Sequence, residues 1–219
     1  MKRLPEPELM EDHAQVKAYA KADFEIPHYQ FIERLKLFIN KPQFSGTALD
    51  LGCGPGDISC RFAKAFPLSK VHAVDGSEAM IDYCKLSTSR ELKTRIRFIL
   101  GMLPDVILPQ SGYEIIFCNS LLHHLHDPQG LWQVIKKYSR QGTRVVVMDL
   151  LRPDCLESAQ KLVKTYALDE PEILKRDFYY SLLAAYTLPE IKKQLTQAGL
   201  NFFVEQISDR HVFITGIAP

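Results

Sequence analysis

An acidic residue leads three alternate glycines in the run Asp50-Leu51-Gly52-Cys53-Gly54-Pro55-Gly56. Glycine adopts positive φ readily, and without a Cβ it lets a ligand approach the backbone closely. Such a turn favours a nucleoside-type ligand, although an ordinary strand-to-helix turn is the alternative. The dinucleotide pattern G-x-G-x-x-G would place its third glycine at position 57, which is Asp57. This departure disfavours an NAD-linked oxidoreductase.

A second acidic residue lies at the end of the next apolar run, 70–75. Asp75 is nineteen residues beyond Gly56, close to the spacing at which an acid accepts hydrogen bonds from a ribose. A carboxylate suits a ribose diol because it accepts protons from both hydroxyls. The two acids and the glycine turn therefore predict one nucleoside site.

Histidines concentrate after the predicted strand 113–119, in the run Ser120-Leu-Leu-His-His-Leu-His-Asp-Pro128. A histidine can act as a base near neutral pH. We expect His124 first, and His123 second, to be the base or the residue that orients the acceptor. Consecutive helical residues point about 100 degrees apart, so the two are not expected to share a role. The alternatives are a histidine bonded within a helix terminus and, less favoured without a thiol or carboxylate cluster, a metal site with His126.

Alternating strand and helix patterns predict an α/β fold with a Rossmann-like, doubly wound, seven-stranded sheet. The last two strands are separated by a single residue, Asp209, which makes the final strand antiparallel. The predicted strands are 47–51, 70–75, 95–100, 113–119, 143–150, 201–208 and 210–217.

We divide the chain into an N-terminal helical cap, 1–43, and a cofactor-binding domain, 44–219, with a helical insertion at about 151–186. The cap either packs on the edge of the sheet or covers the cofactor as a lid. Its candidates for the inner face are Tyr19, Phe24, His28 and Tyr29. The insertion covers the substrate side, where tyrosines either line a pocket or belong to the core; these are Tyr179, Tyr180 and Tyr186.

Composition limits the classes of partner. The chain has 219 residues, of which 46% are hydrophobic and 24% charged, as in globular proteins. Lys and Arg total 27 against 26 for Asp and Glu, so no basic field favours nucleic acid. The five cysteines are odd in number and lack C-x-x-C spacing, which argues against disulfides and zinc. Without a signal peptide or an apolar run of eighteen residues, we expect a cytoplasmic protein with no membrane span.

The acidic residue with alternate glycines, followed by Asp75, resembles motif I and the ribose acid of the class I S-adenosylmethionine (SAM) dependent methyltransferases. The His-His pair before Asp-Pro resembles the branch that includes the ubiquinone and menaquinone biosynthesis C-methyltransferases. The resemblance covers 44 to the C-terminus. It implies SAM as cofactor and S-adenosylhomocysteine (SAH) as product. The implied cofactor-binding residues are Asp50, Gly52, Cys53, Gly54, Gly56, Asp75, Gly76, Met80, Gly101, Met102, Leu103 and Asn119.

Two departures refine that resemblance. Met102 replaces the aspartate that often reads the adenine amino group in this family, so either the backbone or Asp105 must do so. Asn119 is not followed by the Pro-Pro-aromatic run of the amino-methylating DNA enzymes. We therefore expect methyl transfer to oxygen or carbon of a small-molecule acceptor, with Tyr19, His28 and Tyr179 contacting it. The alternative is a non-catalytic SAM-binding protein, and monomer and homodimer both remain open.

Overall fold

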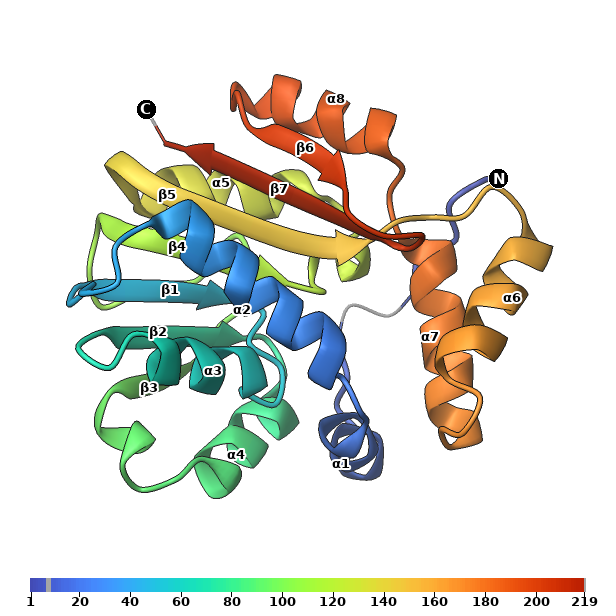
Figure 1. Ribbon diagram of the computed structural model, residues 1–219, viewed down its shortest axis with the longest axis horizontal. Helices are drawn as coiled ribbons and strands as arrows, with labels where there is room; N and C mark the ends of the chain where they lie inside the picture. Colours follow the sequence, from blue (N-terminus) through green and yellow to red (C-terminus); the bar gives the residue numbers. More distant parts are fainter. Residues whose placement is uncertain (7–8, 219) are drawn as a thin grey trace.

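A seven-stranded sheet runs through the middle of the computed structural model, which describes residues 1–6 and 9–218 (Figure 1). The strand order is β3-β2-β1-β4-β5-β7-β6, and β7 runs opposite in direction to the other six strands. The predicted fold class is confirmed. The strands are β1 Thr47–Leu51, β2 Lys70–Asp75, β3 Ile96–Leu100, β4 Tyr113–Asn119, β5 Ser139–Leu150, β6 Phe203–Gln206 and β7 His211–Ile217.

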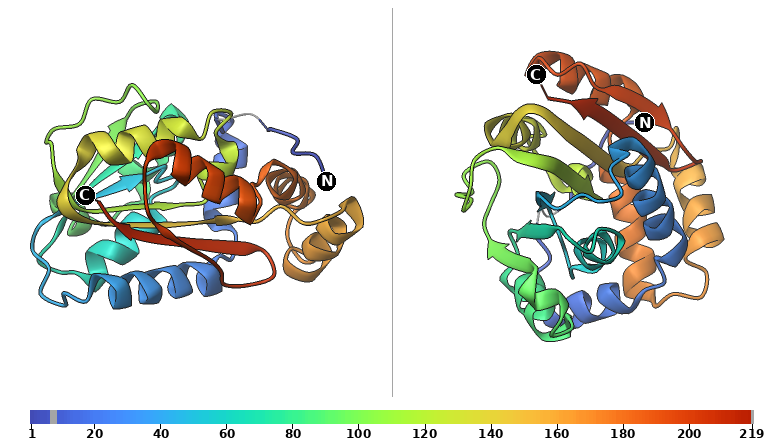
Figure 2. Two further views of the ribbon diagram at one scale, coloured as in Figure 1. Left: turned by 90° about the horizontal axis from the view of Figure 1, so that it is seen from above. Right: turned by 60° about the vertical axis from the view of Figure 1, so that its left-hand side comes forward.

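Helices cover both faces of this sheet, which makes three layers (Figure 2). One face packs against α2 (Glu25–Ile39), α3 (Asp57–Ala65) and α4 (Glu78–Ser87). The other packs against α5 (Gln129–Tyr138) and α8 (Leu188–Ala198). Successive side chains of a strand point to opposite faces, so in β1 Ala48 joins the first core, while Leu49 and Leu51 join the second. The near-continuous apolar strands of the sequence follow from burial on both faces.

The remaining helices gather beyond the carboxyl ends of the parallel strands (Figure 1). They are α1 (His13–Lys21), α6 (Leu156–Tyr166), α7 (Glu172–Ala184) and the short η2 (Leu122–His124); η1 (Leu92–Thr94) precedes β3. Arg3 ties the N-terminal residues to this group. Its guanidinium donates to the carbonyls of Ala184 at 2.5 Å, His123 at 2.8 Å and Leu125 at 3.0 Å.

Local signals determine several helix ends. Thr187 and Glu190 form the predicted capping box of α8, and Gly199 ends that helix with φ at +68°. The side chain of Ser77 accepts from the amide of Met80 at the start of α4. These ends agree with the sequence because a cap depends on a few adjacent residues.

The predicted single-residue turn before the last strand was wrong. Four residues, 207–210, separate β6 from β7. The Ser208 hydroxyl accepts from the amides of Arg210 and His211, which closes a wider polar turn. Strand β5 also begins earlier than predicted, at Ser139, because that residue pairs with Tyr113 of β4.

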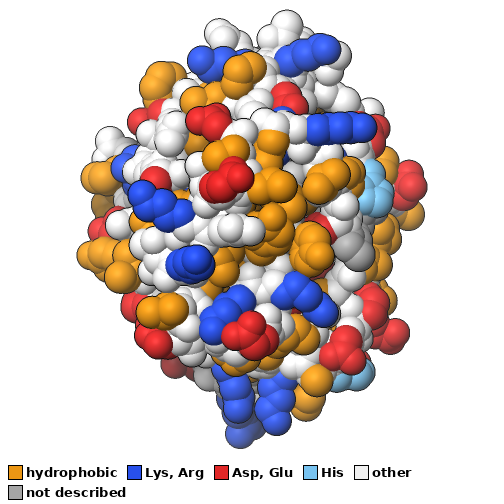
Figure 3. All heavy atoms as spheres, turned by 90° about the vertical axis from the view of Figure 1, so that its right-hand side faces the viewer, with side chains coloured by type: hydrophobic (Ala, Val, Ile, Leu, Met, Phe, Trp, Pro, Cys, Tyr) orange, Lys and Arg blue, Asp and Glu red, His pale blue; other side chains and the backbone are white. Residues whose placement is uncertain are grey.

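The face that carries α6 and α7 has hydrophobic side chains surrounded by charges of both signs (Figure 3). Across the described residues, no helix combines the length and apolar character that a bilayer crossing requires.

Candidate active site

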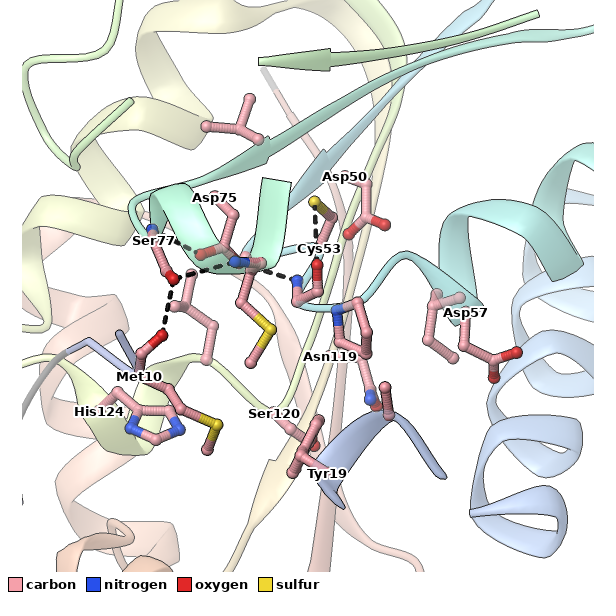
Figure 4. Close-up of a pocket in the computed structure, with 18 of the residues that line it drawn as sticks. Met10, Tyr19, Asp50, Cys53, Asp57, Asp75, Ser77, Asn119, Ser120 and His124 are labelled. Atoms are coloured by element: carbon pink, nitrogen blue, oxygen red, sulfur yellow. Dashed lines mark hydrogen bonds between the residues drawn. The ribbon is translucent and has the colours of Figure 1, made fainter. Parts of the chain in front are cut away.

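A cavity of about 260 Å³ opens at the carboxyl ends of β1, β2 and β4. The strand order reverses between β1 and β4, and open α/β sheets bind ligands at such a switch point. Asp75, Ser77 and Cys53 lie along one side of the cavity, while His124, Ser120 and Tyr19 lie along another (Figure 4).

The glycine turn forms the floor of this cavity. Gly52, Gly54 and Gly56 have φ of +74°, +51° and +86°, which L side chains rarely adopt. A Cβ on Gly52 would lie 2.8 Å from the side chain of Leu121, whereas a Cβ on Gly54 would meet nothing within 4 Å. Gly52 and Gly54 line the cavity, and Gly56 instead caps α3. Gly54 therefore leaves its backbone open to a ligand.

Asp75 connects the end of β2 to this turn. Its Oδ2 accepts from the amide of Gly54 at 2.8 Å, and its Oδ1 accepts from the amide of Ser77 at 2.9 Å (Figure 4). Burial raises the pKa of the Asp75 carboxyl, and these amides oppose the rise. The carboxylate is thus held in one orientation at the cavity wall, as a ribose-binding acid requires.

Two further polar side chains face the cavity from strand ends. Asp50 is 1% exposed and accepts from the Ser59 hydroxyl, and burial raises its pKa to about 7. The Oδ1 atom of Asn119 is buried, with no hydrogen-bond partner among the residues described. A buried acceptor without a partner is costly, so this amide suits a ligand that supplies a donor.

The loop after β3 supplies the predicted adenine side of the cavity. Gly101, Met102 and Leu103 line the cavity, as do Gly76 and Met80, and Asp105 does not. The sulfur of Met102 lies close enough to Gly76 to meet a Cβ there at 2.4 Å. Of the two groups predicted to read the adenine edge, the backbone of this loop therefore borders the cavity and Asp105 lies outside its lining.

The N-terminal segment covers the cavity. Leu9, Met10, Tyr19, Phe24 and His28 all line it, and the Ser77 hydroxyl donates to the carbonyl of Met10 at 2.6 Å. Of the four aromatic candidates for an inner face, only Tyr29 points outward, with 57% of its surface exposed. The part of the cap before α2 therefore covers the cavity as a lid, whereas α2 packs on one face of the sheet.

The tyrosines of the insertion lie elsewhere. Tyr179 does not line the cavity; it packs against the small core between α6 and α7, with its ring 5.8 Å from that of Tyr180. Tyr186 donates to the carbonyl of Leu125 at 2.8 Å. Helical periodicity alone does not distinguish aromatic residues of a core from those of a pocket.

The two adjacent histidines have different environments. His124 lines the cavity, with 27% of its side chain exposed. His123 is 3% exposed, and its Nδ1 lies 2.6 Å from Oδ1 of Asp149. Burial alone would lower the pKa of His123, but the Asp149 carboxylate outweighs it and the pKa is raised. The two rings lie 4.2 Å apart, and both approach the carboxylate of Glu6.

Sequence reasoning missed several residues that shape the site. Asp149 is the last residue but one of the buried strand β5 and accepts from the amide of Leu122; an acid near a strand end was the signal available for it. Ser120 has φ of +56°, a strained conformation that clusters at functional sites. Nothing in the sequence indicated that Glu6 would approach η2, because 117 residues separate Glu6 from His123.

A charged cluster at the cavity mouth was also missed. Oδ2 of Asp57 lies 2.7 Å from Nδ1 of His28 and 2.6 Å from Nε of Arg61, and Arg61 also donates to Glu25. Burial alone would raise the pKa of Asp57, but the bonds from His28 and Arg61 lower it. The cluster holds the start of α2 against the start of α3.

A seven-stranded sheet with an antiparallel β7, an acidic residue before alternate glycines, and an acid at the end of β2 are the features that the resemblance to class I SAM-dependent methyltransferases predicts. The methyltransferase domain family matches residues 48–142. Residues 48–142, which include the glycine turn and Asp75, are thus similar to methyltransferase domains.

Named proteins show the same relationship. Malonyl-[acyl-carrier protein] O-methyltransferase 1 of Ilyobacter polytropus is 21% identical over 185 residues, covering 84% of this chain and 66% of that protein. Trans-aconitate 2-methyltransferase of Variovorax paradoxus is 29% identical over 124 residues, which cover 56% of this chain and 45% of that protein. A SAM-dependent methyltransferase from Aquifex aeolicus has a similar fold, with a TM-score of 0.72, 17% identity, and coverage of 96% of this chain and 100% of that one. The chain spans about one to two thirds of the curated relatives' length.

Proposed function

We propose that this chain binds SAM in the cavity and transfers its methyl group to oxygen or carbon of a small-molecule acceptor. The observation that carries the proposal is the convergence of Asp75 with the open backbone of Gly54 at the switch point of the sheet. The family supports the type of reaction. The acceptor is inferred from the neutral net charge and from the sequence that follows Asn119.

The residues around the cavity fit the three parts of this cofactor. Asp75 is placed to accept from the ribose hydroxyls. Asp50 and Asn119 present acceptors for the ammonium group of the amino-acid part, and the unpartnered Oδ1 of Asn119 supports that role. Met102 and Leu103 offer apolar surface for the adenine ring.

SAM supplies a methyl group already activated by the positive charge on its sulfur. The protein therefore mainly needs to align the acceptor and exclude water. The apolar side chains of Leu9, Met10 and Phe24 close the cavity from the N-terminal side. No covalent intermediate on the chain is required.

His124 is the residue that we place beside the acceptor, because it lines the cavity and remains partly exposed. It serves as the base or as the group that orients the acceptor. His123 is buried behind it and bonded to Asp149, so we assign it a positioning role instead. Tyr19 and His28 line the same cavity and remain candidates for contact with the acceptor.

Calorimetric titration with SAM, SAH and NAD tests the cofactor. We expect saturable binding of SAM and SAH, weakened about 10- to 100-fold in Asp75→Ala because bonds to a charged acceptor are lost. The matched control is Asp82→Ala, which removes an exposed carboxylate paired with Lys85 on α4. Binding of NAD alone, or equal losses in both variants, would contradict the proposal.

Turnover is then tested with phenols, quinones and small carboxylic acids, by the mass gain of one methyl group and by SAH release. Product formation that is lost in Asp75→Ala supports methyl transfer. SAM binding without turnover on any acceptor in this panel would favour the non-catalytic SAM-binding alternative.

A further inference from the structure

Three side chains that could ligate a metal meet beside the cavity, and the proposed methyl transfer leaves their grouping unexplained. They are Glu6, His123 and His124, whose ligand atoms all lie within 4.8 Å of one another. Oε1 of Glu6 is 3.7 Å from Nε2 of His123 and 3.4 Å from Nδ1 of His124. The cluster combines the N-terminal segment with η2, and the sequence did not indicate it because Glu6 lies far from the histidines in the chain.

The separations suit a bound ion. Zinc binds imidazole nitrogen and carboxylate oxygen at about 2.0–2.2 Å, so two of its tetrahedral ligands lie about 3.4 Å apart. The distances from Glu6 to the two histidines are close to that value. The two histidine nitrogens lie within 4.8 Å of each other, so a small rotation of the imidazole of His124 toward His123 would complete the set.

The environment of His123 directs one nitrogen toward the cluster. A carboxylate only accepts hydrogen bonds, so Nδ1 of His123 must donate to Asp149 at 2.6 Å. In the neutral imidazole, Nε2 then carries a lone pair that faces Oε1 of Glu6. Metal-ligating histidines are usually oriented in this way, by a carboxylate on the other ring nitrogen.

Glu6 supplies a second, independent indication. Its side chain is only 12% exposed, and its Oε1 atom has no hydrogen-bond partner among the described residues. The carboxylate oxygen of Glu6 and the lone pair on Nε2 of His123 are both acceptors. They face each other across 3.7 Å and repel unless a proton or a cation lies between them. The buried carboxylate of Asp149 lies on the other side of His123, so carboxylates flank this imidazole at both of its nitrogens, and a cation beside Glu6 is favoured.

We propose that Glu6, His123 and His124 bind one divalent transition-metal ion, with Asp149 as the group that orients His123. Two imidazoles and one carboxylate suit zinc or iron(II), and they leave coordination positions open. Because His124 also lines the cavity, an open position adjoins the space for the acceptor. Such an ion would hold an acceptor oxygen, and His124 would then orient the acceptor rather than act as a base. The ion would also fasten the N-terminal lid.

The test uses untagged protein treated with a chelator, in a Cys155→Ser background because Cys155 is the exposed thiol. Calorimetry with Zn²⁺ alone should show one saturable site per chain, and Co²⁺ should give a visible absorption band. Glu6→Gln and His124→Gln should each weaken Zn²⁺ binding by much more than tenfold. Asp149→Asn should weaken it about 10- to 100-fold, as other changes in groups that orient a ligand do.

His126→Gln is the matched control, because Nε2 of His126 lies 3.0 Å from the backbone carbonyl of Glu6 and outside the three-residue cluster. It should bind Zn²⁺ as the parent does. Absence of saturable binding, or equal affinity in Glu6→Gln and the parent, would overturn the proposal. Circular dichroism confirms that each variant folds, and Glu6→Gln changes no residue of the main cores. SAH titration of the metal-free protein separates failure of this site from failure of the cofactor assignment.

Discussion

The carboxylate of Asp75 accepts a hydrogen bond from the amide of Gly54 at 2.8 Å, so the end of β2 holds the turn that follows β1. The amides of Gly52 and Cys53 both donate to the carbonyl of Val74, which strengthens the same connection. The cofactor cradle is therefore made by two neighbouring strand ends that stabilise each other, and a change at either one should affect binding.

Gly54→Ala should weaken SAH binding at least about tenfold. Its φ of +51° costs alanine about 1–2 kcal/mol, and the new methyl projects into the open space of the cavity. Gly142→Ala is the matched control, since its φ is +84° with equally open surroundings outside the cavity. Urea unfolding should show similar losses of stability in both variants. Equal SAH affinities would contradict the role of Gly54.

Val16→Asp should detach the lid while leaving the sheet intact. Val16 is 1% exposed and packs α1 against Ala79 and Met80 of α4, and an unpaired buried carboxylate costs several kcal/mol. If the closed state becomes a minor population, the apparent SAH affinity falls in proportion, by at least about tenfold. Calorimetry measures this loss, and trypsin should cleave α1 faster.

Ala14→Asp provides the control for that experiment, because it adds the same charge at an exposed position of the same helix. It should bind SAH as the parent does. If Val16→Asp binds equally well, the N-terminal segment does not contribute to the cofactor site.

Asp50 should make the stability of the ligand-free protein depend on pH. Its folded pKa of about 7 exceeds the value of 3.8 for an unperturbed carboxyl, because burial disfavours the charged form. Between about pH 4 and 7 the folded state keeps a proton that the unfolded state has lost. This stabilisation is complete below pH 4 and is lost progressively as pH rises from 4 through 7, by an amount on the order of 4 kcal/mol.

Asp50→Asn tests that relationship, because an amide cannot ionise. Urea unfolding of both proteins at intervals from pH 5 to 8 gives the difference in free energy of unfolding. The difference should change steadily across this range and level off above pH 7. A difference that is constant with pH would contradict the raised pKa of Asp50.

Asp149→Asn should destabilise the fold by about 2–4 kcal/mol. The carboxylate is 1% exposed and accepts from the amides of Leu122 and Leu150 as well as from His123. An amide side chain cannot accept with both of its terminal atoms, so at least one buried donor loses its partner. Asp169→Asn, at an exposed position, should have no measurable effect on urea unfolding.

The convergence of the residues that we propose for the cofactor could be predicted from sequence, because short-range patterns produce it. The run from Asp50 to Gly56 and the end of β2 each lie within a few residues, and parallel neighbouring strands bring such ends together. Strand bounds at β2 and β4 agree with prediction for the same reason. The capping box of α8 also depends on adjacent residues.

The part of the cavity that we propose for the acceptor depended on tertiary structure. Tyr179 and Tyr19 both lie in helical patterns. Packing places Tyr179 against the core between α6 and α7, and it places Tyr19 at the cavity. Adjacent helical side chains were expected to diverge, yet the rings of His123 and His124 lie 4.2 Å apart and both approach Glu6, which comes from the N-terminal segment.

The sequence by itself determined the fold class and the residues that fit the cofactor, since strand periodicity and turn chemistry are local. Tertiary structure alone decided what covers that site and which distant groups meet beside it. Glu6 reaches the histidines through the hydrogen bonds of Arg3 to the carbonyls of His123, Leu125 and Ala184. Contacts between segments so far apart in the chain follow from packing and charge in three dimensions, which no local pattern encodes.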